Sequence, residues 1–388
     1  MPQHPPEDRL ARLRGSGPEQ SYSARKITAL TANPACDRRA VLDAAGIDKA
    51  LLARRLGHEP RFGRSPFAIA REQGFQAQVT WGGWAELIRL MRQELAAPVE
   101  EAAVADLNEA AGRATPAARH RLTRGLIERI AAGHEERLIL DHPVITLEVA
   151  GRTAYLEPDA LTHRVGGLFY VVEIRSFTAL DGQAEDPAAV AETARQAAVH
   201  ILALRRAFTA AGLDPRQVAH EFLLVCPQDF TNRPYGRLLD VRQELDVIEF
   251  QLGRLRRAED IASWLPRGST LDVGCAVDGC GRLGDCGHPP RRADAELAAS
   301  AAALDASYTP ACLRFCEMAR YCRDEAEATA SPARLGTSVR GDLPGIDSTR
   351  LALAYLDGTA VPDPSQADAV ALLRDAARLR ALRAGGAA

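Results

Sequence analysis

The distribution of cysteines constrains this fold more than any other feature of the sequence. Three of the eight cysteines lie in one short segment, where Cys312, Cys316 and Cys322 form a C-x3-C-x5-C pattern. A fourth, Cys36, lies far upstream of them. Four thiolates can hold one metal centre only if they converge. A centre built from these four residues would therefore tie the two end regions of the chain together.

The sequence favours metal ligands or buried thiols over disulfides. Residues 1–20 are polar and contain prolines, without the apolar segment of a signal peptide. No uninterrupted apolar stretch is long enough to cross a bilayer. We therefore expect a cytoplasmic protein with no membrane partner, in which thiols stay reduced.

The charge pattern excludes one class of protein. The formal net charge is −3, so composition alone does not indicate nucleic-acid binding. Lys26 and Lys49 are the only lysines, and neither follows a glycine in the Gly-Lys-Ser/Thr context of a phosphate-binding loop. The chain therefore carries no ordinary nucleotide-driven motor.

The order of predicted elements indicates an α/β fold. Residues 67–95 have apolar side chains at helical spacing, interrupted near Trp81 and Trp84, and residues 98–137 are predicted to form a helical insertion. We expect a disordered arm at 1–20, a helical N-terminal region at 21–140 that carries Cys36, a core at 141–265, a C-terminal helical region with a Cys-rich loop at 266–382, and a tail at 383–388.

The core segment has the pattern of a mixed sheet with a long helix. The predicted elements are strands at 144–149, 154–162 and 168–174, a helix at 187–212, a strand at 222–226 and a helix at 242–264. The short glycine-containing turn at 165–167 should join its flanking strands in a hairpin.

Two carboxylates lie on this predicted hairpin. Asp159 follows a proline on the first strand, and Glu173 lies on the second, two residues before Arg175. Side chains two apart on a strand share a face, so Glu173 and Arg175 should point the same way. Mg²⁺ prefers oxygen ligands, and phosphodiester hydrolysis needs such a cation to polarise the phosphate and to lower the pKa of a water. Asp159 and Glu173 therefore predict a Mg²⁺ or Mn²⁺ site.

These residues resemble the motifs of RecB-like nucleases in the PD-(D/E)xK superfamily. Pro-Asp followed by Glu-x-Arg is similar to that family's carboxylate motif. Gln196 and His200, one turn apart on the next helix, resemble its Gln-x-x-x-Tyr motif with His at the Tyr position. The resemblance implies a restriction-endonuclease-like core, a mixed sheet flanked by helices. It further implies that the carbonyl of Ile174 is a third metal ligand and that Gln196 organises the site.

Two positions depart from the family pattern. Arg175 stands where the family has Lys, and a guanidinium cannot act as a general base because it keeps its proton. It can still stabilise charge on the phosphate. The family's upstream acidic or His ligand has two candidates here, the neutral Gln76 and His134, and the sequence leaves both open.

The division into one N-terminal and three C-terminal cysteines also resembles a known group. It is similar to the iron–sulfur RecB-like exonucleases, which include CRISPR-associated four-cysteine exonucleases and the nuclease subunit of AddAB-type helicase–nucleases. Four thiolates suit either a [4Fe–4S] cluster or Zn²⁺, and the resemblance favours the cluster. By analogy with a crosslink, it could stabilise the fold by roughly 5 kcal/mol. A weaker group, Cys275, Cys280, Cys286 and His288, could hold a second metal.

The resemblance implies a metal-dependent deoxyribonuclease. Its substrate would be single strands or duplex ends, in DNA repair or antiviral defence, with a separate helicase or defence-system protein as a further partner. Because Arg175 replaces Lys, the alternative is a catalytically inactive nuclease fold that serves as a DNA-binding or scaffold subunit.

Overall fold

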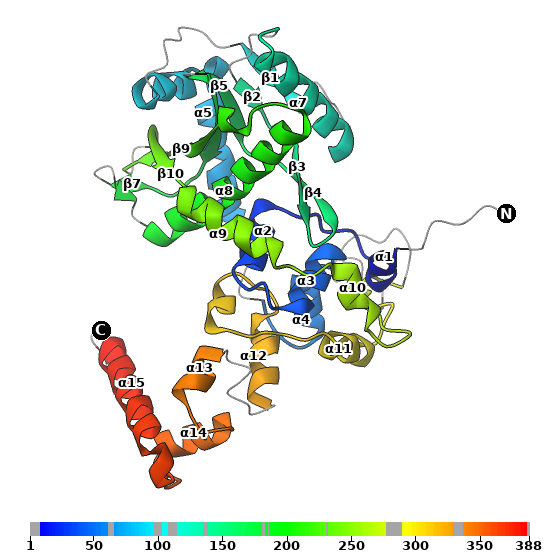
Figure 1. The fold of residues 1–388 in the computed structure, drawn as a ribbon, viewed down its shortest axis with the longest axis vertical. Helices are drawn as coiled ribbons and strands as arrows, with labels where there is room; N and C mark the ends of the chain where they lie inside the picture. The colour runs from blue at the N-terminus through cyan, green and yellow to red at the C-terminus, as the bar shows by residue number, and fades with distance from the viewer. Residues whose placement is uncertain are drawn as a thin grey trace, which may run out of the picture. The chain divides into compact units, whose positions relative to one another are not determined.

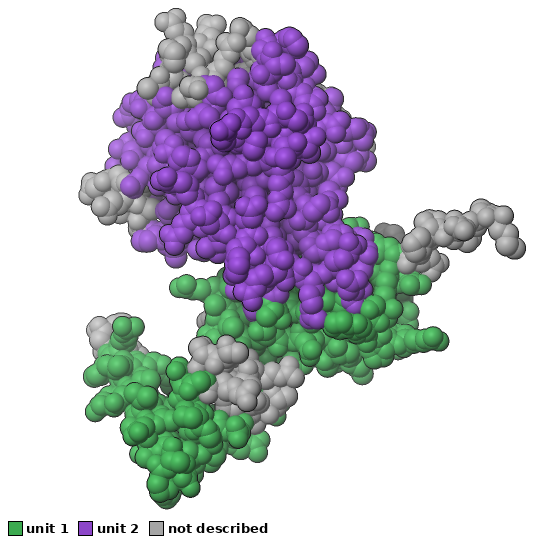
Figure 2. All heavy atoms as spheres, viewed as in Figure 1, with its two compact units in different colours: residues 1–19, 35–62, 261–388 green, residues 20–34, 63–260 purple. Residues whose placement is uncertain are grey.

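The structure is a computed structural model, and the residues it describes are 8–60, 66–95, 103–107, 115–134, 139–165, 167–180, 183–184, 186–229, 232–276, 289–328 and 337–385. The chain divides into two compact units, coloured separately in Figure 2. Unit 1 comprises Met1–Glu19, Ala35–Phe62 and Ile261–Ala388, and unit 2 comprises Gln20–Pro34 and Gly63–Asp260. Each unit therefore combines segments that are distant in the sequence.

The centre of unit 2 is a mixed β-sheet (Figure 1). The strands are β1 (Val104–Asp106), β2 (Ile139–Asp141), β3 (Ile145–Val149), β4 (Arg152–Leu156), β5 (Ala160–Val165), β6 (Leu168–Ile174), β7 (Ala179–Leu180), β8 (Gln183–Ala184), β9 (Val218–Gln228) and β10 (Arg233–Asp240). Neighbours in the sheet follow the order β1-β2-β5-β6-β9-β7-β8, β10 pairs with β9, and β3 pairs only with β4. Strand β6 runs antiparallel to β5 and parallel to β9. The expected hairpin is thus formed by β5 and β6.

Helices flank this sheet, so the fold is mixed α/β. The helices of unit 2 are α2 (Ala24–Thr31), α5 (Pro66–Glu94), α7 (Pro116–Ala131), α8 (Pro187–Ala210), the short 3-10 helix η1 (Pro215–Gln217) and α9 (Arg242–Gly253), and α10 (Ala258–Ser263) begins in it. Val172 and Ile174 of β6 pack in a cluster with α5. The intervening positions face α8, since the rings of Phe169 and Phe208 are 5.0 Å apart. Glu173 therefore points toward α8.

The interruption predicted in the helix at 67–95 is present in α5. Trp81 leaves the helical conformation, and Gly82, Gly83 and Trp84 all have positive φ angles. Trp84 is then buried in the core, whereas Trp81 is 82% exposed. The kink thus separates two tryptophans that would otherwise lie on neighbouring helical positions.

Two predicted elements of unit 2 are divided differently. Residues 154–162 form two strands, because β4 pairs with β3 while β5 pairs with β2 and β6. Pro158, which has no N–H to donate, lies in the break between them. The predicted helical insertion at 98–137 contains α7, but it also contains β1, which pairs in parallel with β2. Pairing with β2 overrides the helical composition at β1, whose three residues are half-buried.

Unit 1 is helical. Its elements are α1 (Arg9–Arg14), α3 (Asp37–Ala44), α4 (Lys49–Arg55), α11 (Asp294–Ala302), the 3-10 helix η2 (Pro310–Arg314), α12 (Ala319–Ala328), α13 (Thr337–Asp342), α14 (Thr349–Leu356), the 3-10 helix η4 (Pro364–Gln366) and α15 (Ala367–Gly385). A small core of Ile346, Tyr355 and Val370 joins α14 to α15. None of the helices in the described ranges of the chain is long and apolar enough to span a membrane.

Three predictions for the ends and the second long helix were wrong. The expected arm contains α1, because Asp8 caps it and Leu10 and Leu13 are buried. The expected tail is helical through Gly385. The predicted helix at 242–264 is two helices, α9 and α10, separated by residues 254–257, where the polypeptide turns back and Ala258 N–H donates to Ala150 O.

Candidate functional site

The hairpin of β5 and β6 brings the two predicted carboxylates together. Asp159 immediately precedes β5, and Glu173 is the penultimate residue of β6. The backbone N–H of Ile174 donates to Asp159 Oδ2 over 2.7 Å, which fixes the aspartate beside the end of β6. Antiparallel pairing of Ala160 with Val172 sets this register. A one-residue slip would turn Glu173 to the opposite face of the sheet.

The guanidinium of Arg175 lies between these carboxylates. Its Nη1 donates to Asp159 Oδ2 and to the Ile174 carbonyl, each over 2.8 Å. Its Nη2 donates to Glu173 Oε2. A single side chain thus contacts all three oxygen groups that the sequence predicts as ligands of a divalent cation. The sequence predicted that Arg175 shares a face with Glu173, but not that it bridges the two carboxylates.

His200 holds the other oxygen of Glu173. Its Nδ1 lies 2.6 Å from Glu173 Oε1, and both side chains are almost fully buried. Helix α8 presents His200 to β6 at this point, a contact that the sequence analysis did not predict. Gln196 lies one turn earlier on α8 and lines the same pocket. Its Nε2 donates to Glu192 Oε1 over 3.2 Å, so this hydrogen bond is made within α8 and not to Asp159 or Glu173.

The electrostatics of the two carboxylates differ. Burial alone would raise the pKa of Glu173, but the charges of Arg175 and His200 outweigh it and lower that pKa. Burial, followed by repulsion from Glu173, raises the pKa of Asp159 despite the opposing effect of Arg175. The pair therefore holds a proton more readily on Asp159 than on Glu173.

The carboxylates open onto a pocket of about 380 Å³. Besides Asp159, Glu173, Arg175, Gln196 and His200, its lining includes Ser21, Tyr22, Ser23, Ala24, Arg25, Pro116, Arg119, Val144, Tyr155, Leu156 and Glu157. Arg119 forms a two-bond ion pair with Glu157, with N–O distances of 2.8 and 3.1 Å. Arg25 is 3.5 Å from Glu192 and roughly half exposed. The pocket thus combines carboxylates for a cation with arginines that could meet a phosphate.

Neither candidate for the upstream ligand lines this pocket. Gln76, on α5, lies with its Nε2 3.4 Å from His142 Nε2. His134 is exposed just after α7, and its backbone N–H donates to Arg129 O. The structure therefore does not bring Gln76 or His134 to the carboxylates.

Three residues near the site were missed by the sequence analysis. His142 Nδ1 lies 2.5 Å from Asp141 Oδ1, and the His142 backbone N–H donates to Asp159 O. The hydrogen bond to Asp141 is the main reason that the pKa of His142 is raised. Glu72 of α5 is close enough to Arg175 to contribute to the raised pKa of that guanidinium. The available sequence signal for them was Asp141 and His142, an acid and a histidine directly after the apolar residues 139–140.

The four predicted cluster cysteines all lie in unit 1, and all are buried. Cys36 directly precedes α3, and burial raises the pKa of its thiol while the backbone N–H groups of Arg39 and Ser307 oppose the rise. Cys312 lies in η2, Cys316 follows it, and Cys322 lies on α12. Electrostatic coupling links Cys36 with Cys312, Cys316 and Cys322, so the four thiols share one region. The structure therefore brings Cys36 and the three C-terminal cysteines into the same unit.

Buried cations surround these thiols. Arg38 Nη1 donates to Cys322 Sγ over 3.2 Å, and its guanidinium also makes two 2.9 Å bonds to Glu325. Arg39 pairs with Asp43, which also pairs with Lys49. Burial raises the pKa of Cys316 to about 11 and that of Cys322 to about 12, while the neighbouring cations oppose the rise. As free thiols, Cys316 and Cys322 therefore keep their protons near neutral pH.

The geometry stops short of a closed metal site. Among the residues that the structure describes, no three His, Cys, Asp or Glu side chains are placed tightly enough to form a ready metal-binding group. The four thiols nevertheless fit a thiolate-ligated centre by donor chemistry, because all four are buried and Arg38 already donates to Cys322 Sγ. Of the weaker group, Cys275 is buried, while Cys280, Cys286 and His288 lie outside the described residues.

Comparisons with known proteins add little. No protein-family profile matches the chain, and no curated protein matches it. A solved structure described as "Crystal structure of SSO0001" aligns with 43% of this chain and 84% of its own length, at 13% sequence identity and a TM-score of 0.19. A similarity this weak carries no argument about fold or function.

Proposed function

We propose that unit 2 is a RecB-like PD-(D/E)xK nuclease core that hydrolyses phosphodiester bonds in DNA, as single strands or duplex ends. The observation that carries the proposal is the convergence of Asp159, Glu173 and the Ile174 carbonyl at one end of the β5–β6 hairpin, beside Arg175 and His200. These residue types come from separate strands and a helix, and they open onto one pocket.

The oxygen set fits a hard divalent cation. Asp159, Glu173 and the Ile174 carbonyl would hold Mg²⁺ or Mn²⁺ once the guanidinium of Arg175 withdraws from them. Such a cation, when bound, polarises a phosphoryl oxygen and lowers the pKa of a water.

The remaining residues would orient Glu173 and neutralise the negative charge of the phosphates. His200 fixes the orientation of Glu173 through the 2.6 Å contact to Oε1. Arg175, displaced toward the pocket, keeps its proton and stabilises negative charge on the attacked phosphate. Arg25 is partly exposed on the same pocket and could contact a neighbouring phosphate of the strand.

One observation favours the second candidate, an inactive nuclease fold that binds DNA as a subunit. Arg175 already contacts every oxygen that the cation would need. If that guanidinium never withdraws, it replaces the cation permanently and cannot supply its water chemistry. The choice between the two functions therefore depends on whether a divalent cation displaces Arg175.

For unit 1 we propose a [4Fe–4S] cluster held by Cys36, Cys312, Cys316 and Cys322. The proposal is supported by the burial of all four thiols and by the contact of Arg38 with Cys322. Hydrogen bonds to sulfur and buried positive charge stabilise thiolate ligands. Because the four residues join α3 to the η2–α12 segment, the role would be structural.

The test is an assay of anaerobically purified protein on fluorescent single-stranded DNA, duplex DNA and RNA, with Mg²⁺ or Mn²⁺. We expect cleavage by wild type, and equal or faster cleavage by Arg175→Lys. The single ammonium group of lysine cannot bridge both carboxylates as the guanidinium does, so it should release them more readily. Asp159→Ala should abolish cleavage, whereas the control Asp214→Ala, which removes an exposed paired carboxylate, should not. Absence of cleavage by wild type and Arg175→Lys, in protein with its full metal content, would leave the binding subunit as the function.

A further inference from the structure

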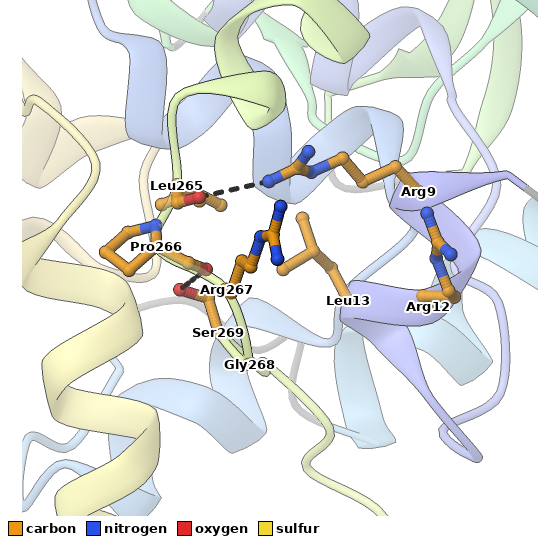
Figure 3. A pocket seen from close by; sticks show the side chains of 8 residues that line it. All are labelled: Arg9, Arg12, Leu13, Leu265, Pro266, Arg267, Gly268 and Ser269. Atoms are coloured by element: carbon orange, nitrogen blue, oxygen red, sulfur yellow. Dashed lines mark hydrogen bonds between the residues drawn. The ribbon is translucent and has the colours of Figure 1, made fainter.

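Unit 1 contains a pocket whose lining, among the residues that the structure describes, includes three arginines and no acidic residue. It encloses about 440 Å³ between α1 and the turn that follows Leu265. The lining residues are Arg9, Arg12, Leu13, Leu265, Pro266, Arg267, Gly268 and Ser269. Figure 3 shows Arg9 and Arg267 reaching from opposite walls toward the same space. Like charges gathered in this way repel each other, so an anion between them would be stabilised.

Neither of these two guanidiniums is neutralised within the described part of the chain. Arg9 Nη2 donates to the carbonyl of Leu265 over 3.0 Å, which anchors one edge of the guanidinium and leaves its other donors available. Arg267 is exposed and makes no hydrogen bond or ion pair with any described residue. The nearby acid, Asp8, caps α1, and its Oδ1 accepts from the N–H groups of Leu10 and Ala11.

The turn presents Arg267 at its tip. Ser269 N–H donates to Pro266 O over 3.2 Å, and Ser269 Oγ donates to the same carbonyl over 2.9 Å. Gly268 has a φ of +85°, the left-handed conformation that the third position of such a turn requires. A substitution of Arg267 therefore removes only an exposed side chain and leaves the turn intact.

We propose that this pocket binds a phosphate group through Arg9 and Arg267. Guanidinium forks match the tetrahedral oxygens of phosphate with paired N–H donors, and a carbonyl-anchored Arg9 loses little further freedom on binding. The phosphate can come from a nucleic-acid strand or from a small phosphorylated ligand. The first source would make unit 1 a strand-binding surface in addition to the proposed nuclease site. The proposal rests on the proposed function only for the choice of DNA as probe.

Trp264 distinguishes the two sources. It directly precedes the pocket wall and leaves 70% of its surface exposed. An exposed indole can stack on an unpaired base, a contact that a small phosphate lacks. If a strand supplies the phosphate, Trp264→Ala should weaken binding of DNA and leave binding of pyrophosphate unchanged.

The experiment measures anisotropy of a fluorescent 20-nucleotide oligothymidine without divalent cations, so that no cleavage occurs. At about 100 mM NaCl we expect Arg267→Ala to weaken binding about five- to tenfold and to reduce the salt slope of log K by about 0.7, the loss of one single-strand phosphate contact. Arg267→Lys should recover only part of the affinity, because it restores charge without the fork. Arg216→Ala, which removes an exposed arginine paired with Asp214, is the matched control.

A second measurement follows the thermal stability of each variant with pyrophosphate. If pyrophosphate stabilises wild type but not Arg267→Ala, while oligonucleotide binding is equal in both, the site is a phosphate site for a small ligand. If Arg267→Ala matches wild type with both probes, or if Arg216→Ala loses as much affinity, the proposal is overturned. If Arg267→Ala still cleaves DNA, its binding result concerns the pocket and leaves the nuclease proposal untouched. If wild type binds DNA through the pocket but does not cleave it, the nuclease proposal fails and the pocket proposal stands.

Discussion

Replacement of Arg175 by alanine should expose the repulsion that this guanidinium now neutralises. Arg175 contacts both carboxylates, so Asp159 and Glu173 lie on the order of 5 Å apart. With an effective dielectric constant of about 20, two negative charges at that separation repel by about 3 kcal/mol. We therefore expect Arg175→Ala to lower the free energy of unfolding by about 2–4 kcal/mol at neutral pH without metal.

Divalent cations and protons should each reverse this loss. A cation at about one hundred times its Kd should restore about 2.7 kcal/mol to Arg175→Ala, since it occupies the position that the guanidinium leaves. The pKa of Asp159 is already raised, and loss of Arg175 should raise it further. The destabilisation of the variant is therefore present above that pKa and decreases as pH falls and Asp159 takes up a proton. Wild type behaves oppositely through Glu173, whose lowered pKa contributes stability that is lost as pH falls.

The assay is urea unfolding of wild type, Arg175→Ala and Arg216→Ala, monitored by far-UV circular dichroism at several pH values, with and without Mn²⁺. Arg216→Ala controls for the loss of one exposed charge and should change stability by less than about 0.5 kcal/mol. Equal unfolding midpoints for Arg175→Ala and wild type would refute the bridged-carboxylate geometry. Restoration by NaCl as effective as by Mn²⁺ would refute a specific cation site.

Three further predictions concern the two units. Arg38→Ala should destabilise the protein by about 3–5 kcal/mol in urea unfolding, because it leaves Glu325 and buried carbonyls without their partner; Arg323→Ala, which removes an exposed arginine from the helix that carries Glu325, should cost less than about 1 kcal/mol. Cys36→Ala should lose iron and the broad absorbance near about 400 nm of a thiolate-bound cluster; retained colour and an unchanged melting temperature would show that it is not a ligand. Glu173→Gln should abolish cleavage with either metal, and undiminished activity in the fluorescent-DNA assay would remove Glu173 from the site.

Much of the local structure followed from the sequence. The strand predicted at 168–174 has the bounds of β6, and the helix predicted at 187–212 is α8 to within a few residues. Both have strong periodic patterns, and a side chain's place in such a pattern depends only on its own neighbours in the chain. The same reasoning placed Glu173 and Arg175 on one face, and it placed Gln196 and His200 one helical turn apart.

Pairing between distant segments was decided by the tertiary structure. Residues 154–162 form one continuous β-rich run in the sequence, and only the competing partners β3 and β2 show that Asp159 stands at a break between two strands. The bridge that Arg175 makes between the two carboxylates was likewise decided by the tertiary structure. Alternation gives the direction of its side chain, but not the distance to Asp159, which depends on the register of β5 against β6.

The region around the cysteines shows most clearly what the sequence could predict and what only the tertiary structure decided. The resemblance of their one-plus-three division to that of iron–sulfur exonucleases led us to expect Cys36 near the segment from Cys312 to Cys322. The charges around them were not predictable, because Arg38, Arg39 and Lys49 look like the polar face of an ordinary helix until η2 and α12 cover them. The sequence determines which side chains share a face of a helix or strand. Whether a charged side chain is buried depends on the distant segment that packs over it. Only a buried charge loses its hydration and therefore needs a partner in the protein.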